Sequence, residues 1–196
     1  MPGQDYQIRM KLKVLFLILT LNMSLITSAE SFGIVVHGGA GVLSGLSIER
    51  QQEIENKVKE TLISAYKILE DGGSSMDAVE FAVSEFEDST LFNAGKGSVY
   101  NSDGVQEMDA SIMNGADRSA GAVASVQIIK NPIKLARKVL EETDHVLLVG
   151  RGAEIFAKDI EETIVDRSYF HSEKNLKRLK KAKRSEEHTS ELQSPM

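Results

Sequence analysis

The strongest constraint on the fold is a pair of amphipathic helical segments that follow each other between residues 47 and 86. Ser47 can cap the first helix, and the sequence Asp71-Gly72-Gly73 ends it. Ser74, with Asp77 three residues later, can open the second helix. Apolar residues recur at helical spacing in both, at Ile54, Val58, Leu62, Ala65 and Leu69 and then at Met76, Val79, Val83 and Phe86. Each helix must therefore bury one face against another layer of structure.

Short runs punctuated by glycine predict the strands of that other layer. Residues 33–37 form a β-branched run that ends in a glycine turn, which is typical of a buried strand. Residues 97–101, 106–114 and 120–129 predict antiparallel strands, with turns at Asp103-Gly104 and Asn114-Gly115. Farther along, Asn131 and Pro132 predict a helix through about Leu140, residues 146–149 a strand, and Gly152 onward another helix. The pattern indicates a layered α/β sandwich.

Composition excludes several functional classes. The 196 residues are 41% hydrophobic and 27% charged, as in soluble globular proteins. A formal net charge of -6 argues against a nucleic-acid partner, because phosphate binding needs a basic surface. The chain has no cysteine, which removes disulfides, thiolate nucleophiles and cysteine zinc sites.

Both ends of the chain are expected to lie outside the folded domain. Arg9, Lys11 and Lys13 precede an apolar run that ends in small residues at Ala29, so residues 1–29 are predicted to be an extension and a cleaved signal peptide. This run is too short for a membrane anchor, and a secreted or periplasmic location follows. Residues 184–196 resemble the translation of a sequencing adapter and are expected to be artefactual. Residues 30–183 then form one domain, in which the basic segment 172–183 is a solvated helical face or linker.

Two glycine loops are the candidate functional segments. The first, His37-Gly38-Gly39-Ala40-Gly41, could let backbone N–H groups approach an anion, but as an isolated motif it is more often a plain turn. The second, residues 91–99, carries one polar side chain, Asn93, between apolar neighbours. No lysine follows the first loop as in a phosphate-binding loop. No serine triad or histidine zinc site is indicated either.

The order of the motifs is more specific than each motif alone. Residues 36–41, 91–97, 108–115, 120–124 and Asn131-Pro132 follow one another as in the plant-type asparaginase/isoaspartyl peptidase family, which the chain resembles from about Gly33 to Lys183. The resemblance implies an αββα sandwich of the N-terminal-nucleophile hydrolase type, of which only the first half is present. It also implies self-cleavage before a threonine in a Gly-Thr-Val-Gly-like motif. This chain lacks that motif.

The resemblance implies supporting residues for a site whose nucleophile is missing. The turn His37, Gly38 and Gly39 would pack beside the nucleophile, and Asn93 would orient it. No cofactor is required, but a structural sodium ion is implied, held by backbone carbonyls. The matching carbonyls belong to Phe86, Glu87, Ser89, Phe92, Ala94 and Lys96.

The implied substrates are asparagine and β-aspartyl dipeptides. The implied partner is the chain's own β subunit, in an (αβ)2 heterotetramer. Two alternatives stay open, a glycosylasparaginase-like hydrolase and a secreted, non-catalytic module that binds small anions. Without its second half, the chain is expected to be inactive and poorly stable, because apolar strands would be left uncovered.

Overall fold

The computed structural model describes residues 32–39 and 45–193, and side chains as far as residue 185. The chain divides into two units at Gly33, and every helix and strand named below belongs to the unit 34–196. The predicted signal peptide lies outside the described residues. No helix within those ranges is long and apolar enough to cross a bilayer.

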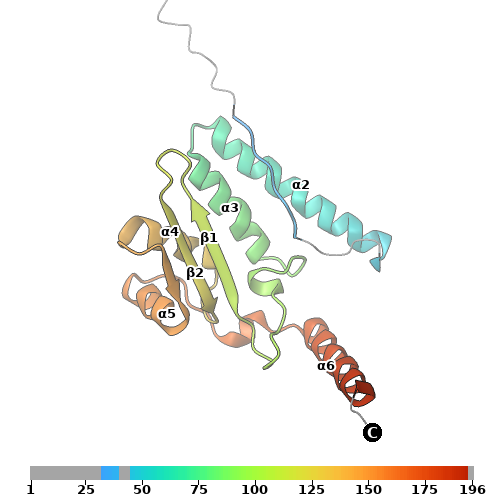
Figure 1. Cartoon of the computed structure of the whole chain (residues 1–196). Helices are drawn as coiled ribbons and strands as arrows, with labels where there is room; N and C mark the ends of the chain where they lie inside the picture. Colours follow the sequence, from blue (N-terminus) through green and yellow to red (C-terminus); the bar gives the residue numbers. More distant parts are fainter. Residues whose placement is uncertain (1–31, 40–44, 194–196) are drawn as a thin grey trace, which may run out of the picture. The chain divides into compact units, whose positions relative to one another are not determined.

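Two helices open the folded unit, as the sequence predicts (Figure 1). Helix α2 spans Ile48–Glu70, and the hydroxyl of its N-cap Ser47 accepts the N–H of Arg50. Helix α3 spans Ser75–Glu87 and begins with a capping box between Ser74 and Asp77. The two helices pack against each other.

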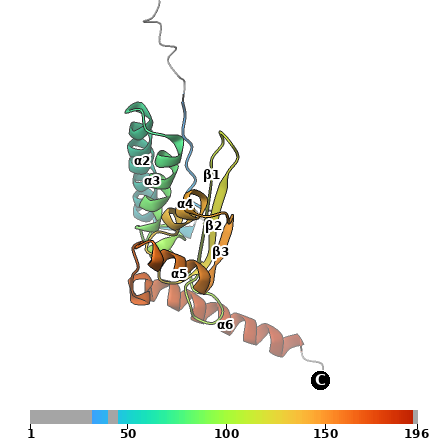
Figure 2. The same cartoon turned by 90° about the vertical axis from the view of Figure 1, so that its left-hand side faces the viewer.

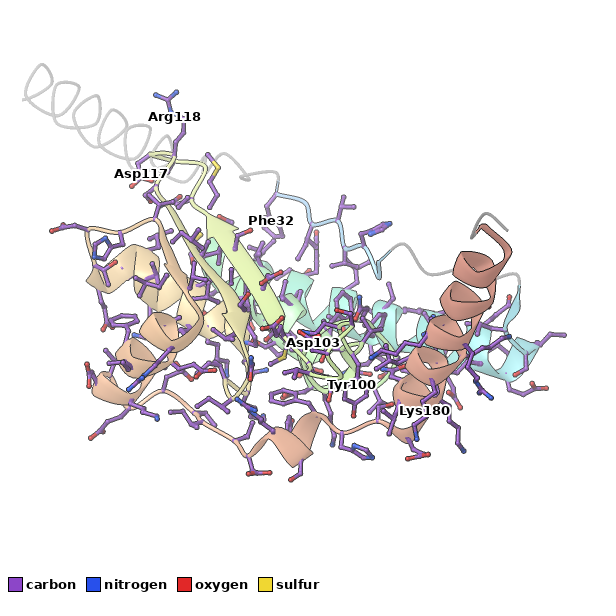
Figure 3. All side chains as sticks on the ribbon, turned by 60° about the horizontal axis from the view of Figure 1, so that its bottom comes forward. Phe32, Tyr100, Asp103, Asp117, Arg118 and Lys180 are labelled. Atoms are coloured by element: carbon purple, nitrogen blue, oxygen red, sulfur yellow. The ribbon has the colours of Figure 1, made fainter. Side chains whose placement is uncertain are left out.

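A three-stranded sheet forms the second layer, in the order β1-β2-β3. Strands β1 (Met108–Met113) and β2 (Ala120–Val126) pair as an antiparallel hairpin. Asp117 and Arg118 stand at the tip of this hairpin (Figure 3). Strand β3 (Leu147–Val149) pairs with β2 in parallel, because helix α4 (Pro132–Glu142) connects the two strands as a crossover. The predicted strand 146–149 is confirmed, but not in an antiparallel arrangement.

Helix α4 (Pro132–Glu142) packs on β1 and β2, and helix α5 (Gly150–Asp159) packs on β2 and β3. The core between the sheet and the helices is formed by apolar side chains with 5% exposure or less; they include Met108, Ile112, Val123, Val126, Ile133, Leu135 and Val139. Gly121 permits the close approach of β2 to α4, because a Cβ there would collide with the carbonyl oxygen of Ala136.

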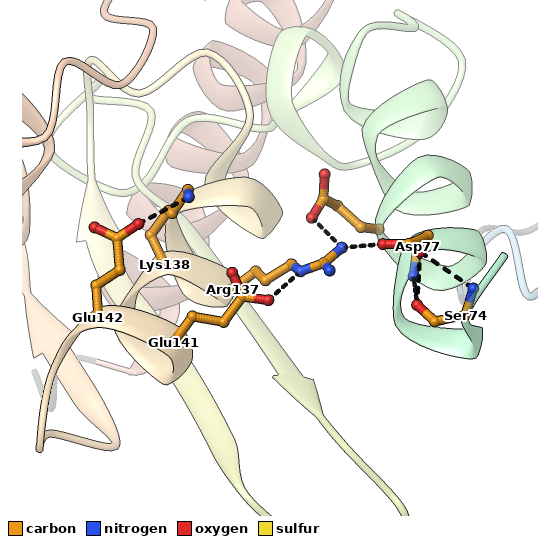
Figure 4. A network of polar contacts seen from close by, with 7 residues as sticks. Ser74, Asp77, Arg137, Lys138, Glu141 and Glu142 are labelled. Carbon is orange, nitrogen blue, oxygen red and sulfur yellow. Dashed lines mark hydrogen bonds and ion pairs between the residues drawn. The ribbon is translucent and has the colours of Figure 1, made fainter.

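A charged network joins α3 to α4 on the outside of this core (Figure 4). The guanidinium of Arg137 donates to Asp77 at 2.7 Å, to Glu80 at 3.1 Å and to Glu141 at 2.6 Å. The Ser74 hydroxyl, followed by Arg137, holds the pKa of Asp77 below its usual value of 3.8. The same carboxylate therefore caps α3 and pairs with α4.

The opposite face of the sheet is not covered by any element in the described part of the chain (Figure 2). Met113, Leu147 and Val149 on that side are 57%, 51% and 52% exposed. The structure is thus a mixed α/β fold with one small sheet and helices α2 to α6. The described residues contain one sheet, and the expected αββα sandwich stays a prediction.

Two predicted strands are wrong. Residues 33–37 form no strand, and Val35 is 95% exposed instead of buried. No described strand pairs with this segment, and an extended run without a paired neighbour has no ladder hydrogen bonds. Residues 97–101 form no strand either. Gly97 ends the 3-10 helix η2 (Gly95–Gly97), and the residues after it lead into a turn where the N–H of Asn101 donates to the carbonyl of Val105.

The C-terminal segment begins with the 3-10 helix η3 (Arg167–Phe170), whose Phe170 is buried. Helix α6 (Glu173–Gln193) follows and includes the basic segment. Its first turn is fixed to the preceding fold: the amide of Asn175 donates to the carbonyls of Gly97 and Ser98 at 3.1 and 3.0 Å. Residues 172–175 are therefore part of the packed unit rather than a free linker.

Candidate functional site

The first glycine loop is described only as far as Gly39. The N–H of Gly39 donates to Nδ1 of His37 at 3.2 Å, and Gly39 has a positive φ of 95°. His37, Gly38 and Gly39 are all exposed. The His37 ring is thus held by its own turn, with no other side-chain partner recorded among the described residues.

The second loop lies against the first through Phe92. A Cβ added to Gly38 would lie 3.1 Å from the ring of Phe92 and 3.7 Å from Val58. Phe92 is 6% exposed and packs on Phe86, with ring centroids 4.3 Å apart. Asn93, the next residue, is exposed, and its Oδ1 accepts the N–H of Val99 at 2.9 Å. The fold therefore brings Gly38 and the Asn93 loop together, while Asn93 keeps its Nδ2 donors free of any recorded protein partner.

Residues 86–97 wind from the end of α3 through turns into η2 rather than extending as a strand. Some of the carbonyls expected to hold sodium converge here on two glycines. A Cβ on Gly97 would lie 3.0 Å from the carbonyl oxygen of Ser89 and would collide with that of Phe92. A Cβ on Gly95, whose φ is 46°, would collide with the carbonyl oxygen of Glu87. Only glycine fits this cradle of oxygens.

The remaining predicted carbonyls are arranged differently. The oxygen of Phe86 accepts the N–H of Ser89 at 3.2 Å, and the oxygen of Ala94 accepts the N–H of Gly97 at 2.9 Å. Each can still offer a second lone pair. Lys96 directs its ammonium over the ring of Tyr169, 5.2 Å from the centroid. In the described residues no cluster of three or more histidine, aspartate or glutamate side chains could hold a metal. A cation in this loop would thus depend on backbone oxygens.

The side chain of Glu87 is a feature that sequence reasoning missed. It is 3% exposed, and Oε1 accepts the N–H of Ile133 at the start of α4, at 3.0 Å. Oε2 is buried and has no hydrogen-bond partner. Burial raises the pKa of Glu87 to about 8, against the opposing effects of the hydrogen bond from Ile133 and of the nearby Asn131 amide. No sequence pattern marks this residue, because its burial depends on α4 packing over the end of α3.

The neighbouring carboxylate, Asp88, ties the same loop to the segment before α4. It accepts hydrogen bonds from Lys130 at 3.0 Å and from the amide of Asn131 at 3.2 Å. Burial alone would raise the pKa of Asp88, but the bonds from Lys130 and Asn131 outweigh it and lower the pKa. Asn131, expected to cap α4, makes no side-chain cap bond; its amide serves Asp88 instead. Glu87 supplies the acceptor at the start of α4.

Comparison with known proteins assigns a family to this arrangement. The family described as Asparaginase matches residues 30–196. An isoaspartyl peptidase/L-asparaginase of Rattus norvegicus is 48% identical over 151 residues, which are 74% of this chain and 45% of the rat protein. The Homo sapiens protein of the same name is 47% identical over 150 residues, 76% of this chain and 48% of the human one. A plant-type L-asparaginase of Pyrococcus horikoshii is 53% identical over 125 residues, 64% of this chain and 40% of the archaeal one.

The chain is a mixed α/β unit with two adjoining glycine loops, and the family model matches it along residues 30–196. The chain therefore belongs to the asparaginase family. Its relatives are named isoaspartyl peptidases and plant-type L-asparaginases. The chain spans less than half the length of these relatives.

Proposed function

We propose that the chain is the N-terminal part of a self-cleaving amidohydrolase that releases aspartate from L-asparagine and β-aspartyl peptides. The observation that carries the proposal is the contact of Gly38 with Phe92, which places Asn93 beside the glycine turn. The relatives named isoaspartyl peptidase/L-asparaginase support the substrate class. Their names also favour this reading over the glycosylasparaginase alternative.

The proposed chemistry needs a residue that the chain does not contain. An N-terminal threonine attacks the side-chain carbonyl while its own α-amino group takes the hydroxyl proton, and ammonia or the amine leaves with that proton. Water then hydrolyses the acyl-enzyme and releases aspartate. No threonine of this chain follows a glycine, as a cleavage motif of the Gly-Thr type requires. The 196 residues alone are therefore inactive, and the missing half supplies the nucleophile as a β subunit in an (αβ)2 heterotetramer.

Asn93 acts in this scheme as an orienting group. Its Oδ1 is held by the Val99 N–H, so the side chain is fixed and Nδ2 can donate toward the threonine. Gly38 supports the site by packing against Phe92 of the Asn93 loop, and His37 and Gly39 complete its turn. Gly39 has a positive φ, which glycine adopts without steric cost, and this conformational freedom suits a turn that adjusts during self-cleavage.

The loop of residues 86–97 holds a structural sodium ion in this proposal. The close approach of the carbonyl oxygens of Glu87, Ser89 and Phe92 to Gly95 and Gly97 supports this, because it gathers backbone oxygens in one short loop. The ion would stiffen the loop that carries Asn93. The mature chain would begin near Glu30 after signal-peptide cleavage, in a secreted or periplasmic location, as the charged, apolar and small-residue order of residues 9–29 suggests.

The test compares the chain with the same chain extended through a second half that contains a Gly-Thr-Val-Gly motif. Aspartate release is measured from asparagine, from β-aspartyl dipeptides and from an Asn-linked sugar. We expect the extended protein to cleave itself and to hydrolyse the first two substrates, and the short chain to hydrolyse none. Turnover by the short chain would disprove the missing-nucleophile argument. A preference for the Asn-linked sugar would favour the glycosylasparaginase alternative.

A further inference from the structure

A cavity of about 310 Å³ lies where the first turns of α2 and α6 meet the loop that follows α3. Its polar lining includes Arg50 from α2, Asn93 from the loop, and Lys174, Asn175 and Arg178 from α6. The volume is at the lower end of the range for small-molecule sites, roughly 300 to 1,000 Å³. The space is therefore suited to a small polar ligand.

Positive charge reaches this cavity from two separate elements. None of its lining residues is an aspartate or glutamate. Arg50 is positioned by an ion pair with Glu53 at 2.8 Å and by a hydrogen bond to the carbonyl of Thr90 at 3.4 Å. Lys174 and Arg178 are four residues apart on α6, an unfavourable spacing for like charges, and neither has an ion pair recorded in the described residues. An anion in the cavity would relieve this repulsion.

The basic face of α6 is held against the cavity by a buried contact. Asn175 is 8% exposed and donates to the carbonyls of Gly97 and Ser98. Ser172 accepts the N–H of Asn175 at 3.2 Å and begins the helix. The positions of Lys174 and Arg178 along the cavity wall are thus set by the packing of the fold.

The neutral lining adds a further donor. The Oδ1 of Asn93 is engaged by Val99, so its Nδ2 is the group available to a ligand. With Arg50 on one element and Lys174 and Arg178 on another, donors approach the cavity from several directions. One carboxylate can pair with the guanidinium of Arg50 while a second pairs with the two α6 cations.

We propose that this cavity binds a small dicarboxylate. Two negative groups match cations that come from two elements, and a single compact anion such as phosphate is the alternative that the experiment separates. The cavity shares Asn93 with the proposed nucleophile chemistry, whereas Arg50, Lys174 and Arg178 belong to the cavity alone. Aspartate, the product of the proposed reaction, belongs to the same chemical class, but binding here does not depend on turnover.

The experiment measures thermal unfolding of the full 196-residue chain by circular dichroism, with increasing succinate, acetate or phosphate at constant ionic strength. A ligand that binds only the folded state raises the melting temperature in a saturable manner, from which an affinity follows. We expect saturable stabilisation by succinate in the millimolar range or tighter, and weaker effects of acetate and phosphate. Stabilisation by phosphate equal to or greater than that by succinate would overturn the dicarboxylate assignment.

A matched pair of lysines separates the cavity from diffuse charge. Lys174→Gln removes a cavity cation, whereas Lys180→Gln removes a cation that is also on α6 but outside the cavity lining (Figure 3). Loss of one charge-assisted hydrogen bond should weaken succinate binding about tenfold in Lys174→Gln and in Arg50→Gln. Lys180→Gln should bind as the wild type does. Equal weakening by both lysine substitutions would show a nonspecific charge effect and overturn the proposal, and the comparison is independent of enzymatic activity.

Discussion

The side chain of Gln106 offers a quantitative test of how the C-terminal segment is joined to the fold. Its Nε2 donates to the carbonyls of Ser98 and Phe170, both at 2.7 Å, and the residue is 7% exposed. Gln106→Leu keeps a similar volume but removes both of these bonds to the backbone, together with a longer one to the Ser98 hydroxyl at 3.3 Å. The carbonyl of Ser98 retains the donor from Asn175, whereas that of Phe170 keeps no recorded partner.

Gln106→Leu should lower the free energy of unfolding by about 2 to 4 kcal/mol, because it removes the bonds to Ser98 and Phe170 and leaves the Phe170 carbonyl without a donor. The assay is urea unfolding followed by far-UV circular dichroism, read as a shift of the midpoint at constant m-value. Gln127→Leu is the matched control, because Oε1 of Gln127 is buried without a partner and its amide makes only an exposed bond to Glu107. An apolar replacement there should cost less than about 1 kcal/mol. Equal effects of the two substitutions would refute the reasoning.

Three further predictions concern the charged network and two close approaches. Arg137→Gln should lower the free energy of unfolding by about 1 to 2 kcal/mol at neutral pH, as measured by urea titration. Because the pKa of Asp77 is depressed in the folded state, this difference from wild type should shrink when the titrations are repeated below pH 3.8. Gly97→Ala should collide with the Phe92 carbonyl and abolish any stabilisation by sodium chloride over tetramethylammonium chloride in thermal unfolding. Gly121→Val should force β2 from α4 and cost about 1 to 3 kcal/mol of unfolding free energy, whereas an unchanged urea midpoint would contradict the contact.

The sequence predicts best where structure is decided locally. Ser47 and the Ser74-Asp77 box begin their helices as expected, because a cap hydrogen bond spans only three residues. The turn at Asn114-Gly115 likewise joins an antiparallel hairpin. Failures occur where a distant partner decides the outcome. Residues 33–37 have the composition of a strand, but nothing in their own sequence says whether a neighbouring strand exists to pair with them.

The same limit applies to the candidate site. The proximity of the two glycine loops could be expected only from the family resemblance, since no local rule brings Gly38 to Phe92 across more than fifty residues. Glu87 is buried at the start of α4 and Asn175 against the backbone of Gly97 and Ser98, although both residue types are usually exposed. A buried carboxylate and a buried amide become visible only when packing is known.

The uncovered side of the sheet connects the fold to the proposed function. One face of the sheet buries Ile112, Val123 and Val126 against the helices, whereas the other face exposes apolar residues of β3 such as Leu147 and Val149. A sheet with apolar residues on both faces needs a layer on each side, because exposed apolar area of this kind promotes association. In the proposed assembly the second half provides that layer and brings the threonine with it. Folding of the two halves and completion of the active site would then be one event, because the half that covers the exposed apolar face of the described sheet would also supply the nucleophile.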